Sequence, residues 1–398
     1  MTKPAFQRAF VPVLASRLAE SRHTMQILAG PRQVGKTTGV LQAIKSWGPN
    51  RSHFVSGDEV NVPDHAWLRA HWEKAREKAG HGAPAVLVLD EIQRLAQWST
   101  TVKSLWDEDT RHRLPLHVVL LGSSALLMQK GLTESMAGRF EILPVAHWSL
   151  AEEAKAFGWG LDQHLLFGGY PGPAGLASDP ARWRAQVRQA LVEPALSRDV
   201  LAMGTIEKPE LLRQLFRAAC QHAGQVVSYS KLLGQLTDKG NTTILAHYQA
   251  LLERAWLILG LQKFSGSIER TRASSPKWLP LAPALITATS DQAWNDWTRP
   301  GEARGQLVEA AVGAHLARQC RHKSWWLGYW SQGDAEVDYV LKTPSQLWGI
   351  EVKSGRARNL RSLNLFLKKY PKARPMVIAG EGGTLDQFLL SDLQHLDQ

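Results

Sequence analysis

The sequence is poor in cysteine and has no long apolar run. Among its 398 residues only Cys220 and Cys320 are cysteines, and neither has a second Cys or a His at metal-ligand spacing. These absences exclude a disulfide framework and a structural zinc module, and they favour a reducing compartment. No apolar run approaches the ~20 residues that span a bilayer, and residues 1–14 lack the continuous apolar core of a secretion signal. We therefore expect a cytoplasmic protein with no membrane partner.

The charge balance is positive. The chain has 47 Lys and Arg residues against 36 Asp and Glu residues, which gives a formal net charge of +11. Such a charge favours polyanionic partners through counterion release, and nucleic acid is the first candidate. Contact with a ribosome or an anionic membrane surface would satisfy the same charge, and many basic enzymes have no such partner. A content of 44% hydrophobic and 21% charged residues is typical of a soluble globular protein.

A glycine-rich loop follows the first short apolar run. Residues 25–29 predict a buried strand, and the loop after them fits the pattern G-x-x-x-x-G-K-[ST]. Its glycines let backbone N–H groups close around phosphate oxygens, and the helix expected next adds its positive dipole end. Lys36 can reach the β- and γ-phosphates, and the Thr37 hydroxyl can ligate Mg²⁺. The residues predicted to contact a nucleotide are Gly30, Pro31, Arg32, Gln33, Val34, Gly35, Lys36, Thr37 and Thr38.

A second motif favours phosphate binding over a simple glycine-rich turn. Residues 85–89 form an apolar strand that ends in Asp90 and Glu91. In a P-loop ATPase the first of two such carboxylates holds the Mg²⁺ shell and the second polarises the attacking water. We therefore predict ATP and Mg²⁺ as cofactors, with Thr37 and Asp90 as metal ligands and Glu91 as a catalytic residue.

Polar residues follow a third apolar strand, at residues 116–121. In an open α/β sheet the carboxyl ends of the strands meet the ligand, so Ser123 or Ser124 is expected to sense the γ-phosphate. Capping of the next helix is the alternative interpretation. Further on, Arg139 follows a glycine and is predicted to reach the γ-phosphate of a neighbouring subunit, with Arg198 as a second candidate. A plain surface arginine is the alternative.

In its N-terminal part the chain resembles the AAA-type P-loop ATPases of bacteria and archaea. The resemblance rests on a GPRQVGKTT loop, a Leu-Asp-Glu-Ile-Gln box, a Gly-Ser-Ser end to the third strand, and an Ala-Gly-Arg-Phe element. A Pro-x-x-x-x-Ser-x-x-Glu run follows at residues 144–152, and Gln93 of the box also matches the family pattern, without an assigned role. The resemblance implies ATPase activity and a homo-oligomer, commonly a hexameric ring. It does not fix a biological task.

The middle of the chain resembles a winged helix-turn-helix. Residues 159–180 are rich in Gly and Pro and predict an ordered loop or boundary. Beyond them, residues 230–236 predict a short helix, residues 241–252 a longer one, and residues 256–261 the first strand of a wing. The second helix of such a module can enter a major groove, but a structural lid or interface is the alternative. Charge near this helix is sparse for base readout, and comes only from Lys239, His247 and Arg254.

The C-terminal segment predicts an α-β-β-β-α-β order. The expected helices are residues 306–319 and 361–369, and the expected strands are residues 325–330, 336–341, 347–353 and 376–378.

Within that order, two carboxylates and a lysine fall on adjacent strands. Glu351 and Lys353 are two residues apart and so share one face of a strand, and Asp338 of the neighbouring strand can lie beside them. Converging carboxylates suit Mg²⁺, and a nearby lysine can help to activate water. The arrangement resembles the PD-(D/E)XK phosphodiesterase core, which implies Asp338 and Glu351 as metal ligands, Lys353 as the catalytic lysine and Glu309 as a further acid. An exposed hairpin with an ordinary carboxylate–lysine pair is the alternative.

Together these patterns predict an α/β protein of three parts. Residues 1–155 would form the AAA-type ATP-binding domain, residues 156–270 a helical and winged-helix region, and residues 271–398 the nuclease-like domain. The expected function is a Mg²⁺-dependent ATPase that remodels, moves along or processes duplex or branched DNA, with nuclease activity left open. A nucleotide-gated regulatory or defence switch and a protein remodeller, each with a non-catalytic nuclease-like domain, are the alternatives. Expected partners are DNA and further copies of the chain.

Overall fold

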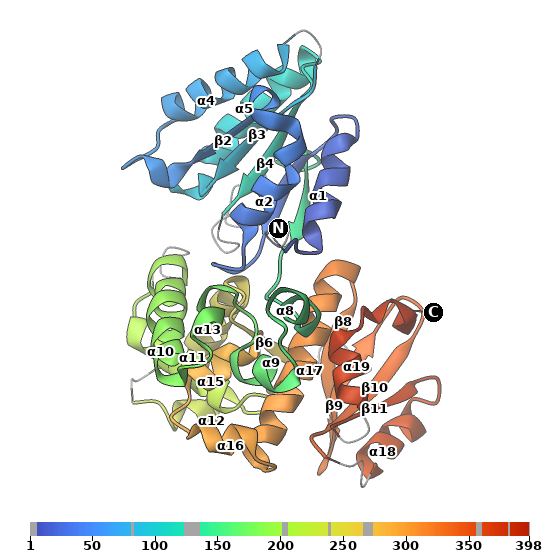
Figure 1. The fold of residues 1–398 in the computed structure, drawn as a ribbon. Helices are drawn as coiled ribbons and strands as arrows, with labels where there is room; N and C mark the ends of the chain where they lie inside the picture. Colours follow the sequence, from blue (N-terminus) through green and yellow to red (C-terminus); the bar gives the residue numbers. More distant parts are fainter. Residues whose placement is uncertain are drawn as a thin grey trace. The chain divides into compact units, whose positions relative to one another are not determined.

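The computed structural model divides the chain into two compact units, Met1–Ala146 and His147–Gln398 (Figure 1). It describes residues 6–80, 83–122, 136–200, 206–237, 240–265, 274–355, 360–380 and 383–397. The predicted division into three parts stays a prediction. Within the described residues, no helix combines the length and the apolar character needed to cross a membrane.

The first unit contains a five-stranded sheet in which all pairs are parallel. Its strands are β1 (Met25–Ala29), β2 (Ser52–Ser56), β3 (Ala85–Asp90), β4 (Leu116–Leu121) and β5 (Phe140–Pro144). They lie in the order β2-β3-β4-β1-β5. Every residue of β1, β3 and β4 is buried, as expected for central strands of a parallel sheet with both faces covered.

Helices cover this sheet on both faces (Figure 1). On one face, Trp72 and Leu105 pack with Ile27 and Leu87 of the strands in one buried cluster. On the other, α1 packs against α2. The helices are α1 (Phe10–Ala19), α2 (Lys36–Ala43), α3 (Gly48–Arg51), α4 (His65–Lys78) and α5 (Trp98–Arg111), with short 3₁₀ turns η1 (Lys45–Trp47), η2 (Gly57–Glu59) and η4 (Ile92–Arg94).

The second unit begins with a helical region. Its elements are α8 (Leu150–Phe157), α9 (Leu161–Phe167), η5 (Gly172–Leu176), α10 (Pro180–Gln186), the π-helical η6 (Val187–Val192) and η7 (Ala195–Val200), α11 (Pro209–Gln221), α12 (Tyr229–Leu233), α13 (Thr242–Arg254), α15 (Pro283–Thr289) and α16 (Trp294–Thr298). The run at residues 144–152 has a local role, because Ser149 and Glu152 form a capping box at the start of α8.

One sequence-based expectation for this region is wrong. Residues 159–180 contain α9 and η5 and are not a plain loop. The glycines and prolines lie at the ends of helices and do not interrupt them. Gly160 and Gly168 are the N-cap and C-cap of α9, and Pro173 lies in the first turn of η5.

A six-stranded mixed sheet follows, in the order β11-β10-β9-β8-β6-β7. Its strands are β6 (Ile258–Lys263), β7 (Lys277–Pro280), β8 (Trp326–Gln332), β9 (Ala335–Lys342), β10 (Leu347–Lys353) and β11 (Arg374–Ala379). The remaining helices are α17 (Glu302–Lys323), α18 (Arg361–Lys369), α19 (Thr384–Leu390) and the 3₁₀ turn η8 (Leu393–Asp397). The α-β-β-β-α-β order expected from the sequence is therefore present from α17 to β11.

The hairpin β6–β7 belongs to this sheet. β6 pairs antiparallel with β7, as the first strand of a wing would, and its far end pairs in parallel with β8 at Gln262–Gly328 and Lys263–Tyr329. A hairpin of the middle region thus extends the C-terminal sheet and brings its side chains next to those of β9. The winged-helix and nuclease-like assignments themselves stay predictions.

Candidate functional site

The loop between β1 and α2 is tightly packed and has an unusual backbone. A Cβ atom at Gly30 would lie 1.8 Å from the Val145 carbonyl oxygen, so a larger residue does not fit there. Gln33 and Gly35 both have positive φ angles, of 57° and 88°. This path carries the loop around the first turn of α2, where helical N–H groups have no partner within the helix and can bind an anion.

Arg8, which precedes the loop in the sequence, hydrogen-bonds to it. This contact was not predicted from the sequence. Its guanidinium is buried and donates to the Val34 carbonyl at 2.9 Å and to the Ala146 carbonyl at 3.0 Å. No local motif marks this residue, because its partners lie far along the chain. Arg8 therefore positions the loop through contacts that only the folded unit shows.

Lys36 lies over the same loop. Its ammonium donates to the carbonyls of Gly30 at 2.9 Å and Pro31 at 2.6 Å. These contacts keep the positive charge at the mouth of the loop. A phosphate group held by the loop N–H groups would meet this charge.

Thr37 and Asp90 are brought together across the sheet. In the strand order β4 separates β1 from β3, yet the Thr37 hydroxyl donates to the Asp90 carboxylate at 2.8 Å. The other Asp90 oxygen accepts from the backbone N–H of Glu91 at 2.9 Å. A hydroxyl and a carboxylate oxygen are hard ligands, and Mg²⁺ in such sites is bound by one or two protein oxygens together with substrate phosphates. The residues present therefore fit the predicted Mg²⁺.

Glu91 follows Asp90 with a left-handed backbone, at a φ of 49°. Burial raises the pKa of the Glu91 carboxyl, and the neighbouring Asp90 raises it further, whereas Arg32, Gln93 and Lys36 lower it. The Gln93 side-chain amide donates to the Glu91 carboxylate. A backbone conformation that is unfavourable for a non-glycine residue persists only where its surroundings impose it. Gln93 thus has a role that the sequence did not reveal, as the partner that positions Glu91.

This contact leads to a prediction for pH dependence. Replacing Gln93 by Ala removes a hydrogen bond that lowers the pKa of Glu91, so that pKa rises further. Because Glu91 would act as a carboxylate, the fall of kcat on the acid side should move to higher pH. The measurement is a kcat–pH profile of ATP hydrolysis, with the exposed Thr100→Ala as control. An acid limb that stays in place would show that Gln93 does not act on Glu91.

The other N-terminal candidates are placed differently. Ser123 and Ser124 lie outside the described residues. The Arg139 guanidinium forms a two-point ion pair with Asp107 of α5, at 2.7 and 3.1 Å, and this contact raises the pKa of Arg139. Arg198 is exposed in η7. Their action on a neighbouring subunit stays a prediction.

The C-terminal candidates do come together. Glu351 and Lys353 share one face of β10, as predicted, with Lys353 Nζ 2.6 Å from Glu351 Oε1. Asp338 of β9 accepts a hydrogen bond from the backbone N–H of Val352 at 2.7 Å. Burial raises the pKa of Glu351, and the charge of Asp338 raises it further, so the two carboxylates lie in each other's field.

A second lysine enters this group. Lys277 of β7 is only 1% exposed, and its ammonium lies 2.7 Å from Glu309 and 2.8 Å from Glu336. Burial alone would lower the pKa of Lys277, but the charges of Glu309, Asp338 and Glu336 outweigh it and raise that pKa. No local pattern marks Lys277 or Glu336, because Lys277 reaches the cluster through the folded sheet, in which β6 pairs with both β7 and β8. Among the described residues, no group of three or more His, Cys, Asp or Glu side chains has the arrangement of a metal site.

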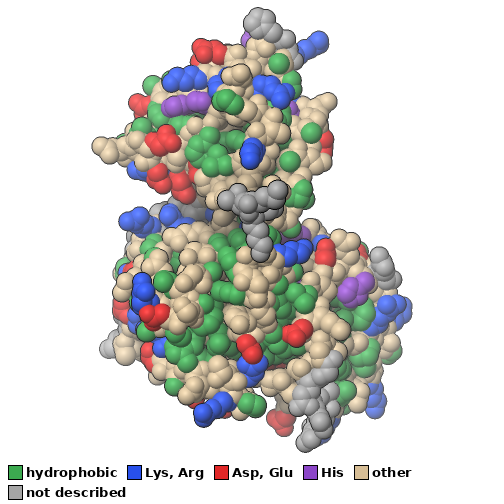
Figure 2. Space-filling view, in the orientation of Figure 1, with side chains coloured by type: hydrophobic (Ala, Val, Ile, Leu, Met, Phe, Trp, Pro, Cys, Tyr) green, Lys and Arg blue, Asp and Glu red, His purple; other side chains and the backbone are tan. Residues whose placement is uncertain are grey.

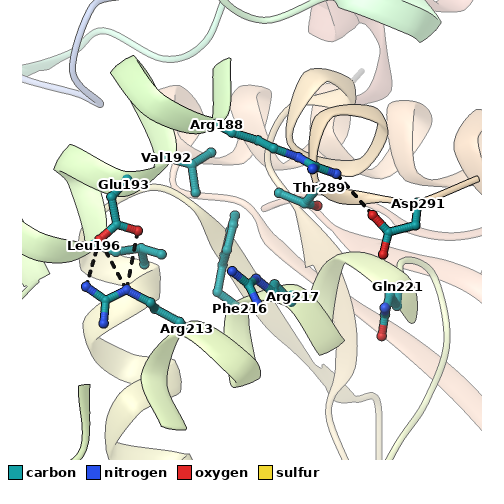
Figure 3. A pocket seen from close by; sticks show the side chains of 10 residues that line it. All are labelled: Arg188, Val192, Glu193, Leu196, Arg213, Phe216, Arg217, Gln221, Thr289 and Asp291. Carbon is teal, nitrogen blue, oxygen red and sulfur yellow. Dashed lines mark hydrogen bonds and ion pairs between the residues drawn. The ribbon is translucent and has the colours of Figure 1, made fainter. Parts of the chain in front are cut away.

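A separate cavity of about 290 Å³ lies among the helices of the second unit (Figure 3). Arg213 is paired with Glu193 at 2.7 Å, and Arg188 is 3.4 Å from Asp291. No residue singled out from the sequence lines this cavity. Since its ion pairs already use these two arginines, we assign no ligand to it.

Family comparisons divide the chain into three segments. A model described as an AAA domain matches residues 22–153. Two models of domains of unknown function, DUF8612 and DUF4143, match residues 158–295 and 304–387. The N-terminal unit is therefore similar to AAA domains, which supports that part of the resemblance. The family models do not specify a winged helix or a nuclease.

Individual proteins are also similar to the chain. Uncharacterized proteins of Mycobacterium bovis and Mycobacterium tuberculosis are 26% identical to it in an alignment 390 residues long that covers 95% of this chain and 81% of each of theirs. Among solved structures, a Walker-type ATPase of Pyrococcus abyssi matches with a TM-score of 0.45 and 13% identity, over 73% of this chain and 99% of that one. The Thermotoga maritima RuvB Holliday junction branch migration motor matches with a TM-score of 0.32 and 17% identity, over 63% and 85%.

Proposed function

We propose that the chain is a Mg²⁺-dependent ATPase that acts on DNA. The observation that carries the proposal is the contact between Thr37 and Asp90 at 2.8 Å, with Glu91 next in the chain. It joins a phosphate-binding loop to a carboxylate pair at one end of a parallel sheet. In such sheets ligands bind at the carboxyl ends of the strands.

Each residue of this group has a chemical task. The backbone N–H groups of residues 32–37 and the Lys36 ammonium would bind the β- and γ-phosphates, with Lys36 exchanging its contacts to Gly30 and Pro31 for phosphate oxygens. Thr37 and Asp90 would hold Mg²⁺, which neutralises charge on the phosphates when bound. Glu91 would orient the attacking water and accept its proton, and its raised pKa suits a base.

The choice of DNA rests on charge. The net charge of +11 favours a polyanion. On the face shown in Figure 2, Lys and Arg side chains are scattered among Asp and Glu over both units. Residues 360–380 contain no Asp or Glu, and within these 21 residues they expose five cations: Arg361, Lys368, Lys369, Lys372 and Arg374. This stretch, α18 and the start of β11, is the surface that we propose for the phosphate backbone.

Assembly into a homo-oligomer is part of the proposal. An arginine that stabilises the γ-phosphate in trans needs a neighbouring subunit, and Arg139 is partly exposed. To act in this way it would have to leave Asp107. A hexameric ring is the form that the AAA resemblance suggests.

The experiment is an assay of steady-state ATP hydrolysis with and without duplex, single-stranded and branched DNA, with the same DNAs analysed on a denaturing gel. We expect at least one DNA form to stimulate hydrolysis, and the stimulation to fall steeply with salt. Replacing Lys368 and Lys372 by Glu should lower the salt slope by about 1 for each lost phosphate contact. Lys45→Glu, an exposed change in the other unit, is the matched control. Hydrolysis that no DNA changes would favour the nucleotide-gated switch or the protein remodeller.

A further inference from the structure

The acidic cluster of the second unit contains a cation of its own. Lys277 is the first residue of β7, and its side chain is 1% exposed. Lysine is almost never buried to this degree without partners, because an ammonium loses its hydration there. Its surroundings must therefore replace the lost water.

Carboxylates from α17 and β9 take the place of the water that the ammonium has lost. The Lys277 ammonium lies 2.7 Å from Glu309 of α17, 2.8 Å from Glu336 of β9 and 3.9 Å from Asp338 of β9. The ammonium also lies 5.2 Å from the centre of the Tyr339 ring, within the range of a cation–π contact. Among these carboxylates, Asp338 is one of the two metal ligands that the nuclease resemblance implies, and Glu309 is its further acid.

The carboxylates are arranged for this ammonium. The 2.8 Å contact to Glu336 is a charge-assisted hydrogen bond from nitrogen, and the 2.7 Å contact to Glu309 is a close ion pair, whereas oxygens around Mg²⁺ lie about 2.0–2.1 Å from the ion. The second oxygen of Asp338 is committed to the Val352 N–H at 2.7 Å. On the other predicted ligand, Glu351, one oxygen contacts Lys353 at 2.6 Å, and the second oxygen is buried without a hydrogen-bond partner. Each predicted ligand thus already faces an ammonium, Asp338 that of Lys277 at 3.9 Å and Glu351 that of Lys353, and a divalent cation added beside these two positive charges does not fit the cluster as it stands.

We infer that Lys277 is the built-in cation of this cluster, and that the cluster ties the β6–β7 hairpin to α17 and β9 and does not bind a divalent metal ion. In this interpretation the carboxylates of the nuclease pattern form ion pairs that stabilise the fold of the C-terminal region. Metal-dependent DNA cleavage is not expected from it. This inference concerns the second unit and does not depend on ATP hydrolysis in the first.

The test is Mn²⁺ binding to the nucleotide-free full chain, measured by electron paramagnetic resonance. The wild type and Asp338→Asn should bind equal amounts of Mn²⁺, because Asp338 has no metal to lose. Lys277→Ala should gain about one Mn²⁺ per chain, because it removes the ammonium and leaves its carboxylates free. Lys277→Ala combined with Asp338→Asn should lose this gain. Any Mn²⁺ held weakly at Thr37 and Asp90 is common to all variants and cancels.

Two results of the Mn²⁺ measurement would overturn the inference. One is Mn²⁺ bound by the wild type and lost in Asp338→Asn. The other is a folded Lys277→Ala protein, as judged by circular dichroism, that binds no more Mn²⁺ than the wild type. If Lys277→Ala does not fold, Lys277→Met keeps the aliphatic stem for the structure, and the comparison of wild type with Asp338→Asn still decides. Mg²⁺-dependent cutting of DNA by the wild type that Asp338→Asn abolishes would also contradict it.

Discussion

ATP is expected to bind to the Glu91→Gln variant and to remain unhydrolysed. The substitution keeps the size of the side chain and removes the carboxylate that would take the proton of the attacking water. Positioned general bases contribute about 10²–10⁴-fold to the rate, and we expect kcat to fall by a factor in that range. Binding should survive because the proposed phosphate contacts would come from the loop and from Lys36, which the substitution leaves unchanged. Nucleotide binding by fluorescence and phosphate release in the same sample measure both effects.

The matched control is Glu77→Gln, an exposed change of the same kind on α4. It should leave both binding and turnover at the wild-type level. Unimpaired turnover by Glu91→Gln would remove Glu91 from the catalytic role. Loss of binding together with turnover would instead indicate that the variant disturbs the fold around η4.

Lys36→Ala is expected to lose nucleotide binding as well as turnover. The ammonium would make charge-assisted contacts to phosphate oxygens, each worth about 1.5–3 kcal/mol. Losing two such contacts corresponds to an affinity loss of at least about 100-fold. Titration of a fluorescent ATP analogue at fixed Mg²⁺ gives the dissociation constants.

Lys45→Ala serves as the control, because Lys45 is exposed just beyond α2 and makes no contact with the loop in the structure. It should bind the analogue as the wild type does. ATP turnover by Lys36→Ala at the wild-type rate would contradict the assignment of the loop. The two variants together separate binding from chemistry, since only Glu91→Gln should retain the nucleotide.

The candidate nucleotide site could be proposed from the sequence because the chemistry of its motifs is local. The loop at residues 30–37 and the pair Asp90–Glu91 each follow an apolar strand directly, and the spacing rules for phosphate and Mg²⁺ apply within each motif. The contact between Thr37 and Asp90 is not local, because β4 lies between their strands. The motif pattern implies this contact, but only the folded sheet gives its distance.

Positioning residues escaped prediction. Arg8 binds carbonyls at Val34 and Ala146, far from it along the chain, and a lone arginine has no pattern that would reveal this. Gln93 was noticed only through the family resemblance. Its contact with Glu91 depends on the left-handed backbone at Glu91, which no propensity for glutamate predicts.

In the C-terminal region, local periodicity predicts the strands and helices, but it does not predict which charged side chains meet. The strands β8, β9 and β10 and the helices on either side follow from alternation and helical spacing. The burial of Lys277 does not follow from such local patterns. It depends on the pairing of β6 with β8, which joins Gln262 to Gly328 far along the chain. The sequence pattern of Asp338, Glu351 and Lys353 therefore did not include Lys277, whose ammonium lies against Glu309 and Asp338.

The central claim is that Gly30–Thr37 and Asp90–Glu91 form one site that hydrolyses ATP in response to DNA. The most direct measurement is steady-state phosphate release by the wild type, without DNA and with duplex, single-stranded or branched DNA, using Glu91→Gln as the blank. We expect release that at least one DNA form increases and that the variant lacks. No release, or equal release by wild type and variant under every condition, would contradict the claim.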